Sequence, residues 1–160
     1  MKNMLSLKFL LIFLIFSKLL FSQDINVTLS VDMNEVDTHP DGVFLAGGGF
    51  GQDGLAMDDS DGDDIWTVTA SFPAGDVGTT KTYKFRNQPS FGTWDGFEDQ
   101  SGLIAGACNT GEYNDRYFVV PAADSTIGTV CYGSCIGCGE TLNQVSITFS
   151  VNMGDVETST

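Results

Sequence analysis

The segment FGTWDGFE, residues 91–98, holds aromatic rings among glycines and acids, in a spacing that neither a strand nor a helix would bury completely. Sugar rings stack their apolar C–H faces on aromatic rings, and their hydroxyls need side chains that donate and accept hydrogen bonds. The side chains in and next to this segment that could make these contacts are the rings of Trp94, Phe91 and Phe97 and the polar groups of Asn87, Asp95 and Glu98. They predict a carbohydrate-binding loop, and the alternative is that the rings fold back as a lid over one end of the domain.

An acidic turn, DDSDGDD at residues 58–64, has the oxygen-rich spacing of a calcium loop. The candidate ligands are Asp58, Asp59, Asp61 and Asp63. The turn lacks the bidentate Glu that closes such a loop at its twelfth position, and Asp and Gly are ordinary turn formers. Calcium is therefore a candidate ligand, a solvated hairpin turn is the favoured interpretation, and no cofactor is expected to be required.

The four cysteines of the chain are Cys108, Cys131, Cys135 and Cys138. In an oxidising compartment they predict two disulfides, for which three pairings are possible. The short separation favours Cys135 with Cys138, which would leave Cys108 to pair with Cys131. Zinc ligation is the less favoured alternative, because no His lies near these cysteines.

Catalysis has little support in the sequence. His39 is the only histidine and lies in a THPDG turn, so no catalytic triad or His-based metal centre can be assembled around a second one. Asp95 and Glu98 form a carboxylate pair of the general kind that cleaves glycosides, but such enzymes hold one acid in an apolar cleft, whereas this loop is acidic and glycine-rich. The fragment is therefore predicted not to be an enzyme, although a glycoside hydrolase domain beyond residue 160 is compatible with it.

The first 22 residues have the features of a secretory signal peptide. Lysines precede an apolar run from Leu10 to Phe16 that is too short to span a bilayer. Cleavage after this segment removes three of the seven basic residues and none of the 21 acids, which leaves a net charge of −17. We therefore expect a secreted, extracellular or cell-surface protein whose mature chain does not insert into membranes and does not bind nucleic acid.

A repeat indicates further tandem domains in the same chain. VTLSVDMNEVDT at 27–38 recurs as ITFSVNMGDVET at 147–158, with six of twelve positions identical. A period of about 120 residues is a whole domain rather than a solenoid unit. The predicted organisation is a signal peptide at 1–22, a β-sandwich module at 23–134, a Cys- and Gly-rich linker at 135–144 and the first strand of a second repeat at 145–160.

Strand signals dominate the predicted module. Alternation is clearest from Val27 to Met33, where every second residue is apolar. In KTYKFRN, residues 81–87, two aromatic residues share one face of the predicted strand while Lys84 and Arg86 share the other. Trp66 lies in another alternating segment and is predicted to belong to the core. With turn clusters between the strands and no helical period, the pattern predicts an all-β, Ig-like antiparallel sandwich of about seven strands.

The motif order GVFLAGGGFG, MDDSDGDDIWTV, KTYKFRN resembles that of glycogen- and starch-binding modules, which are early-set Ig-like sandwiches of amylolytic enzymes and their regulators. Over nearly all of residues 25–138, the chain more closely resembles the tandem β-sandwich repeats of secreted Bacteroidota proteins, found beside laminarinase-type β-glucanases and type IX secretion sorting domains. The motifs that carry this resemblance are VTLSVDM, MDDSDGDDIWTV, YKF, WDGFE, NDRYFVV and TVCYGSC.

The resemblance implies a non-catalytic domain that binds carbohydrate, with Trp94 in the loop where starch-binding modules place a binding tryptophan. Those modules carry another exposed Trp after their G.F motif, whereas this chain has Gln52 there and Phe50 as the nearest aromatic replacement.

The predicted function is that of a polysaccharide-binding accessory module in a secreted or cell-surface glycan-degrading multidomain protein. Trp94 would stack on sugar, Phe91 and Phe97 would extend or support that platform, and the polar side chains would bond hydroxyls. Linked copies would engage a repeating polymer at high effective concentration. The alternative is a structural spacer or adhesin repeat without glycan binding, in which the loop aromatics would be buried.

Overall fold

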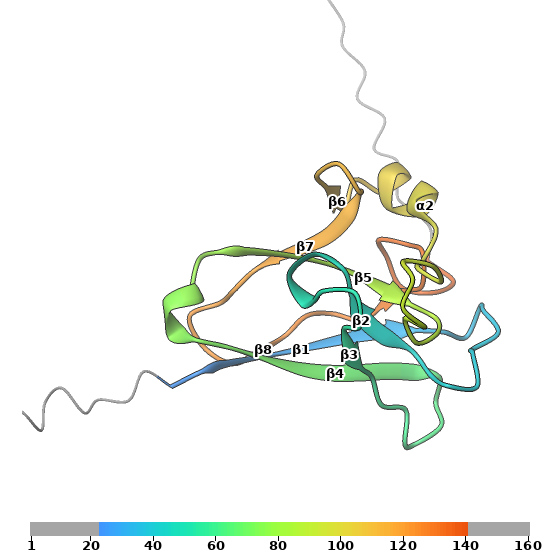
Figure 1. Ribbon diagram of the computed structural model, residues 1–160, viewed down its shortest axis with the longest axis horizontal. Helices are drawn as coiled ribbons and strands as arrows, with labels where there is room; N and C mark the ends of the chain where they lie inside the picture. Colours follow the sequence, from blue (N-terminus) through green and yellow to red (C-terminus); the bar gives the residue numbers. More distant parts are fainter. Residues whose placement is uncertain (1–22, 141–160) are drawn as a thin grey trace, which may run out of the picture.

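Residues 23–140 are described by the computed structural model in Figure 1. The predicted signal peptide at 1–22 and the predicted repeat strand at 145–160 lie outside the described residues. Secretion and tandem repetition therefore stay predictions.

The first sheet is built around β1, whose alternating sequence buries one face and leaves the other partly solvated. β1 pairs antiparallel with β4 from Ile25 opposite Phe72 to Asp32 opposite Ile65. Its other edge pairs in parallel with two short strands, β8 and β9. The strands of this sheet are β4 (Ile65–Phe72), β1 (Ile25–Asp32), β8 (Ser125–Thr126) and β9 (Val130–Cys131). These parallel pairs are a departure from the purely antiparallel sandwich that the sequence predicts.

The second sheet packs against the first and is antiparallel throughout (Figure 1). In spatial order its strands are β3 (Leu55–Ala56), β2 (Phe44–Ala46), β5 (Thr80–Arg86), β7 (Asp115–Val119) and β6 (Asn109–Thr110). The described residues thus form an all-β sandwich, as predicted, with more and shorter strands than expected.

The core lies between the two sheets and follows the predicted alternation. Val27, Leu29 and Val31 of β1, and Met33 directly after it, are each at most 1 % exposed. Trp66 packs against this core, as predicted, and its ring lies against Gly42. Its buried indole N–H has no hydrogen-bond partner among the described residues.

β5 differs from the other strands because both of its faces are covered. Tyr83 and Phe85, predicted to share one face of this strand, both point into the core. On the opposite face, Lys84 is 6 % exposed and Arg86 is 0 % exposed. The loops that follow β2 and β5 fold over this face, and they build the candidate site described below.

One α-helix, α2 (Gln100–Ala105), occurs among the described residues, together with two single 3-10 turns, η2 (Gly48–Phe50) and η3 (Ala74–Asp76). The side chain of Asp99 caps α2 by accepting a hydrogen bond from the Ser101 N–H, and Leu103 anchors it in the interior. Six residues are too few to show a helical period, which is why the sequence pattern does not reveal this helix. Within residues 23–140, no helix is long and apolar enough to cross a membrane.

Two disulfides are present, but their pairing corrects the favoured prediction. Cys108 bonds to Cys135, and Cys131 bonds to Cys138. Sequence separation favours Cys135 with Cys138, but the tight turn in which the Cys131 N–H donates to the Ile136 carbonyl brings Cys131 and Cys138 together. All four sulfurs are bonded, which excludes the zinc alternative and is typical of extracellular proteins. Residues 135–140, predicted to begin a linker, are crosslinked to the sandwich.

Candidate functional site

The predicted carbohydrate loop is an excursion of the chain between β5 and α2 whose two ends are joined. Arg86 and Phe97 form an antiparallel bridge, and the Asn87 N–H donates to the Gly96 carbonyl at 2.9 Å. Gly96 has φ of +79°, and an added Cβ would lie 2.3 Å from a neighbouring side chain, so this closure requires glycine. The aromatic residues between these ends are therefore carried by a loop with a fixed base.

Four side chains form a continuous stack from β2 to the surface, which we call the aromatic stack: Phe44, Arg86, Phe97 and Trp94. The Arg86 guanidinium carbon lies 5.6 Å from the Phe44 ring centre and 5.4 Å from the Phe97 ring centre. The Phe97 and Trp94 rings then stack with centres 6.2 Å apart and planes 20° apart. Trp94 ends the stack and is 61 % exposed, so the outer face of its indole is open to a ligand.

Arg86 holds this stack together without a carboxylate ion pair among the described residues. Its Nε donates to the Gln88 carbonyl at 2.9 Å, and its two terminal nitrogens donate to the carbonyls of Gln52 and Asp53. Burial lowers the pKa of Arg86, and the charge of Asp53 acts in the opposite direction. Because arginine stays protonated in proteins, the stack contains a buried cation that links the two loops covering β5.

An open groove of about 1050 Å³ adjoins the outer end of the aromatic stack. Its side chains include the rings of Trp94, Phe97 and Tyr113 and the polar groups of Lys84, Asp95, Gln100 and Asp115. Lys84 Nζ lies 3.5 Å from a carboxylate oxygen of Asp115, which precedes Arg116, the β7 partner of Tyr83. Gly48 forms part of the wall, where an added Cβ would lie 2.2 Å from a backbone oxygen of β5. The groove therefore combines apolar rings with hydrogen-bonding groups.

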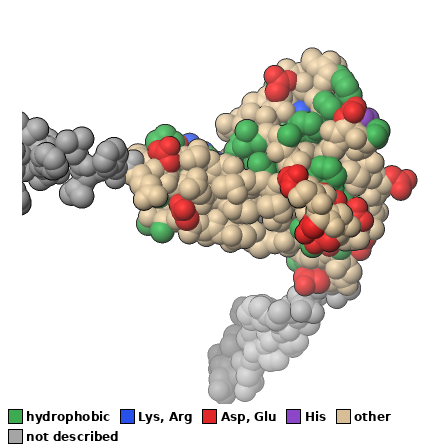
Figure 2. Space-filling model, turned by 90° about the horizontal axis from the view of Figure 1, so that it is seen from below, with side chains coloured by type: hydrophobic (Ala, Val, Ile, Leu, Met, Phe, Trp, Pro, Cys, Tyr) green, Lys and Arg blue, Asp and Glu red, His purple; other side chains and the backbone are tan. Residues whose placement is uncertain are grey.

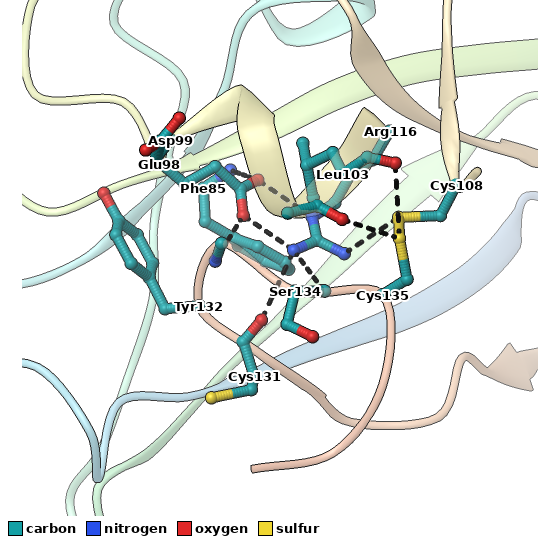
Figure 3. Close-up of polar contacts among 12 residues, drawn as sticks. Phe85, Glu98, Asp99, Leu103, Cys108, Arg116, Cys131, Tyr132, Ser134 and Cys135 are labelled. Atoms are coloured by element: carbon teal, nitrogen blue, oxygen red, sulfur yellow. Dashed lines mark hydrogen bonds and ion pairs between the residues drawn. A yellow bond between two sulfur atoms is a disulfide. The ribbon is translucent and has the colours of Figure 1, made fainter. Parts of the chain in front are cut away.

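Glu98 is not a free binding residue, which corrects the sequence prediction. Its side chain is buried and forms a two-point ion pair with Arg116, at 2.8 Å from Nε to Oε1 and 2.6 Å from Nη2 to Oε2 (Figure 3). The carboxylate also accepts the Phe85 N–H at 3.0 Å and the Gly133 N–H at 2.9 Å. With four donors on its two oxygens, Glu98 has little capacity left for a sugar hydroxyl. It cannot act with Asp95 as a free glycosidase pair.

Arg116 extends this network to the disulfide-linked end of the chain. Its Nη2 also donates to the Ser134 carbonyl at 2.7 Å, and its guanidinium lies over the Phe85 ring at 5.2 Å (Figure 3). The Tyr132 hydroxyl donates to the Gly96 carbonyl at 3.1 Å, and burial raises the pKa of Tyr132 above its ordinary value. The C-terminal segment thus braces the base of the loop that carries Trp94.

Asn87 and Phe91 are also placed differently from the prediction. The Asn87 amide accepts from the His39 N–H and donates to the Asp37 carbonyl, both at 2.9 Å, so it ties two loops together. Phe91 is 64 % exposed with φ of +45°, but it packs edge-on against His39 and does not line the groove. Of the predicted binding residues, Trp94, Phe97 and Asp95 are brought together.

Phe50 does not replace the missing second tryptophan. It is half-buried, and it packs edge-on against the core rings of Phe72 and Tyr83, with ring centres 6.2 and 6.5 Å apart. Gln52 contributes its backbone carbonyl to Arg86. The aromatic residue that the sequence analysis does not identify is Tyr113, which lines the groove and is 68 % exposed. The sequence feature that could have identified Tyr113 is an aromatic residue in an acidic, glycine-containing turn, GEYND, which is the same kind of pattern as FGTWDGFE.

The acidic turn brings three of its four candidate ligands together. Carboxylate oxygens of Asp59, Asp61 and Asp63 lie within 4.8 Å of one another. Asp58 is not part of this group, and its carboxylate accepts the Ser60 hydroxyl at 2.8 Å. Asp59 and Asp63 each also accept a backbone N–H, as the side chains of ordinary acidic turns do.

We expect calcium not to bind this turn in calorimetry of the chelator-treated chain. Three carboxylates fall short of the six to eight oxygen ligands that calcium prefers, and two of them already accept backbone hydrogen bonds. Saturable heat that disappears in Asp61→Asn would contradict this expectation and establish a calcium site.

Comparisons with known proteins give one solved structure of note. No model of a protein family matches the sequence, and no curated protein matches it. The fold is similar to that of CBMd, a family CBM41 module from Eubacterium rectale Amy13K, with 22 % identity and a TM-score of 0.45. The match covers 76 % of this chain and 99 % of that module. A likeness of this size does not transfer a ligand or site residues to this chain.

Proposed function

We propose that the domain is a non-catalytic carbohydrate-binding module that stacks a sugar ring on the exposed face of Trp94. The observation that carries this proposal is that Trp94 is 61 % exposed although its ring is held in place by Phe97. Large exposed aromatics mark interaction sites, and a ring that is already ordered loses little conformational entropy on binding. The groove beside it offers Asp95 and Gln100 to sugar hydroxyls.

The cellular location of this module and the other domains of its protein are proposed from the sequence. A predicted signal peptide, two disulfides and the sequence repeat of the first strand support a secreted or cell-surface protein with tandem copies, part of a larger glycan-degrading protein. Each copy would bind weakly, and linked copies would hold a polymer through avidity. The competing proposal, a structural spacer without ligand, requires that the loop aromatics serve only packing, which is hard to reconcile with the exposure of Trp94.

The test is tryptophan fluorescence of the full chain titrated with laminarin, soluble starch and xylan. Trp66→Phe is used as the background, because the Trp66 N–H has no partner to lose and Trp94 then becomes the single tryptophan. We expect a saturable shift with at least one glycan. Calorimetry of Trp94→Ala should then show a loss of affinity of about tenfold or more, from lost stacking and apolar contact.

Phe91→Ala is the matched control, since Phe91 is an equally exposed ring of the same loop that does not line the groove. It should bind within about twofold of the parent. Equal losses in Trp94→Ala and Phe91→Ala would argue against stacking on Trp94. No binding by the folded parent to any of the glycans would favour the spacer.

A further inference from the structure

Tyr113 lies in the turn between β6 and β7 and is held there by contacts to both sides of the groove. Its backbone carbonyl accepts a hydrogen bond from Lys84 Nζ. The next residue, Asn114, donates to the Gln100 side chain at 3.0 Å and accepts from Asn109 at 2.8 Å. These contacts fix the backbone of the turn that carries the exposed Tyr113 ring, which lowers the entropy cost of placing that ring against a ligand.

Among the residues that the structure describes, the groove has several acidic side chains, and its one lysine is already paired with a carboxylate. Glu98 is neutralised by Arg116, and Asp115 by Lys84. Two groove carboxylates, Asp95 and Asp99, have no basic partner among the described residues. The Ser101 backbone N–H that Asp99 accepts lowers the pKa of this carboxyl, so its charge persists below neutral pH.

The four basic residues after position 22, Lys81, Lys84, Arg86 and Arg116, already have partners within the protein. Lys81 pairs with Asp76, and Arg86 is fully buried in the aromatic stack. Figure 2 shows one face of the molecule, on which acidic side chains are spread widely and little Lys or Arg is visible. A carboxylate or sulfate on a ligand would therefore meet repulsion without a compensating ion pair.

We propose that Tyr113 is a second stacking wall of the groove and that the groove selects uncharged glycan chains over uronic or sulfated ones. This proposal rests on the proposed carbohydrate function and specifies its ligand class. A chain segment would contact Trp94 at one wall and Tyr113 at the other, with the Lys84 and Asp115 pair between them available to hydroxyl groups. The negative charges of Asp95 and Asp99 would repel anionic glycans and so favour uncharged ones.

The experiment compares laminarin, soluble starch and xylan, each with its sulfated derivative, in calorimetry with the full chain. We expect the neutral form of the bound glycan to bind at least about tenfold more tightly than its sulfated form at 50 mM NaCl, and the difference to narrow in 1 M NaCl because salt screens the repulsion. Tyr113→Ala should lower affinity for the neutral glycan about tenfold, and Tyr113→Phe should stay within about twofold of the parent.

Tyr117→Ala is the matched control, because Tyr117 is an exposed tyrosine of the adjoining strand that does not line the groove. It should leave affinity unchanged within about twofold. The proposal is overturned if the sulfated glycan binds as tightly as the neutral one, or if Tyr113→Ala behaves like Tyr117→Ala. Either result, with Trp94→Ala still deleterious, leaves the carbohydrate function intact, whereas absence of binding to all glycans overturns both.

Discussion

Replacing Arg116 by methionine is expected to lower the free energy of unfolding by about 3–5 kcal/mol, because it leaves the Glu98 carboxylate buried without its counter-charge. Glu98 and Arg116 are 2 % and 3 % exposed, so water cannot replace the missing partner. The variant also removes the donor to the Ser134 carbonyl. Since a domain of this size is stable by only about 5–15 kcal/mol, urea unfolding should show a clearly lowered midpoint.

The informative comparison is the double variant Arg116→Met, Glu98→Gln. The Phe85 and Gly133 N–H groups bond to different oxygens of the Glu98 carboxylate, so glutamine can accept from only one of them, but it removes the buried charge. The double variant should therefore be more stable than Arg116→Met alone, which is a positive coupling in a double-mutant cycle. Lys81→Met is the control, since it breaks the more exposed Lys81–Asp76 pair and should cost less than about 1 kcal/mol. Additive losses would show that the pair contributes only as separate contacts.

The alternation of the sequence predicted the sandwich well because its signal is local. In β1 and the residue after it, each second residue from Val27 to Met33 is apolar, and the structure buries these residues as expected. In β5 the alternation placed Lys84 and Arg86 together on the face opposite the core rings, but it did not show that this face is covered. A period of two tells which residues share a face, but it does not tell which distant loop will cover that face.

The candidate site shows the same limit. An aromatic residue in a glycine-rich turn suggested Trp94 and left open whether its ring is a platform or a lid, and the structure has the ring exposed. No local pattern distinguishes Glu98, which pairs with Arg116, from Asp95, which faces the groove, because the difference lies in a partner 18 residues away. The disulfide pairing failed for a similar reason, since the fold brings Cys108 to Cys135 against the preference of sequence distance.

Replacing Arg86 by methionine is the second change expected to have a large effect, and it should act on binding as well as stability. The carbonyls of Gln52, Asp53 and Gln88 would lose their donor, at about 1–3 kcal/mol for each that stays buried. The cation between the rings of Phe44 and Phe97 would also be lost. Urea unfolding should therefore show a loss of several kcal/mol, of order 3 or more.

Arg86 is a positioning residue under the proposed function, because it is buried and reaches a ligand only through Phe97 and Trp94. In the Trp66→Phe background, time-resolved anisotropy should show a more mobile Trp94 in Arg86→Met, and calorimetry should show affinity for the bound neutral glycan lowered about tenfold. Arg86→Lys should restore neither property, since a point charge with one nitrogen cannot bond three separate carbonyls in the geometry of a guanidinium.

If Arg86→Met does not fold, Phe97→Leu can still test whether the aromatic stack holds Trp94 in place. Leucine preserves apolar volume but removes the flat ring between Arg86 and Trp94, so mobility of Trp94 should rise and affinity should fall while the loss of stability stays small. Tyr117→Leu changes an aromatic ring outside the stack and should alter neither. If folded Phe97→Leu keeps both the anisotropy and the affinity of the parent, Trp94 does not depend on the stack, and the order that we ascribe to it must come from the closed base of its loop.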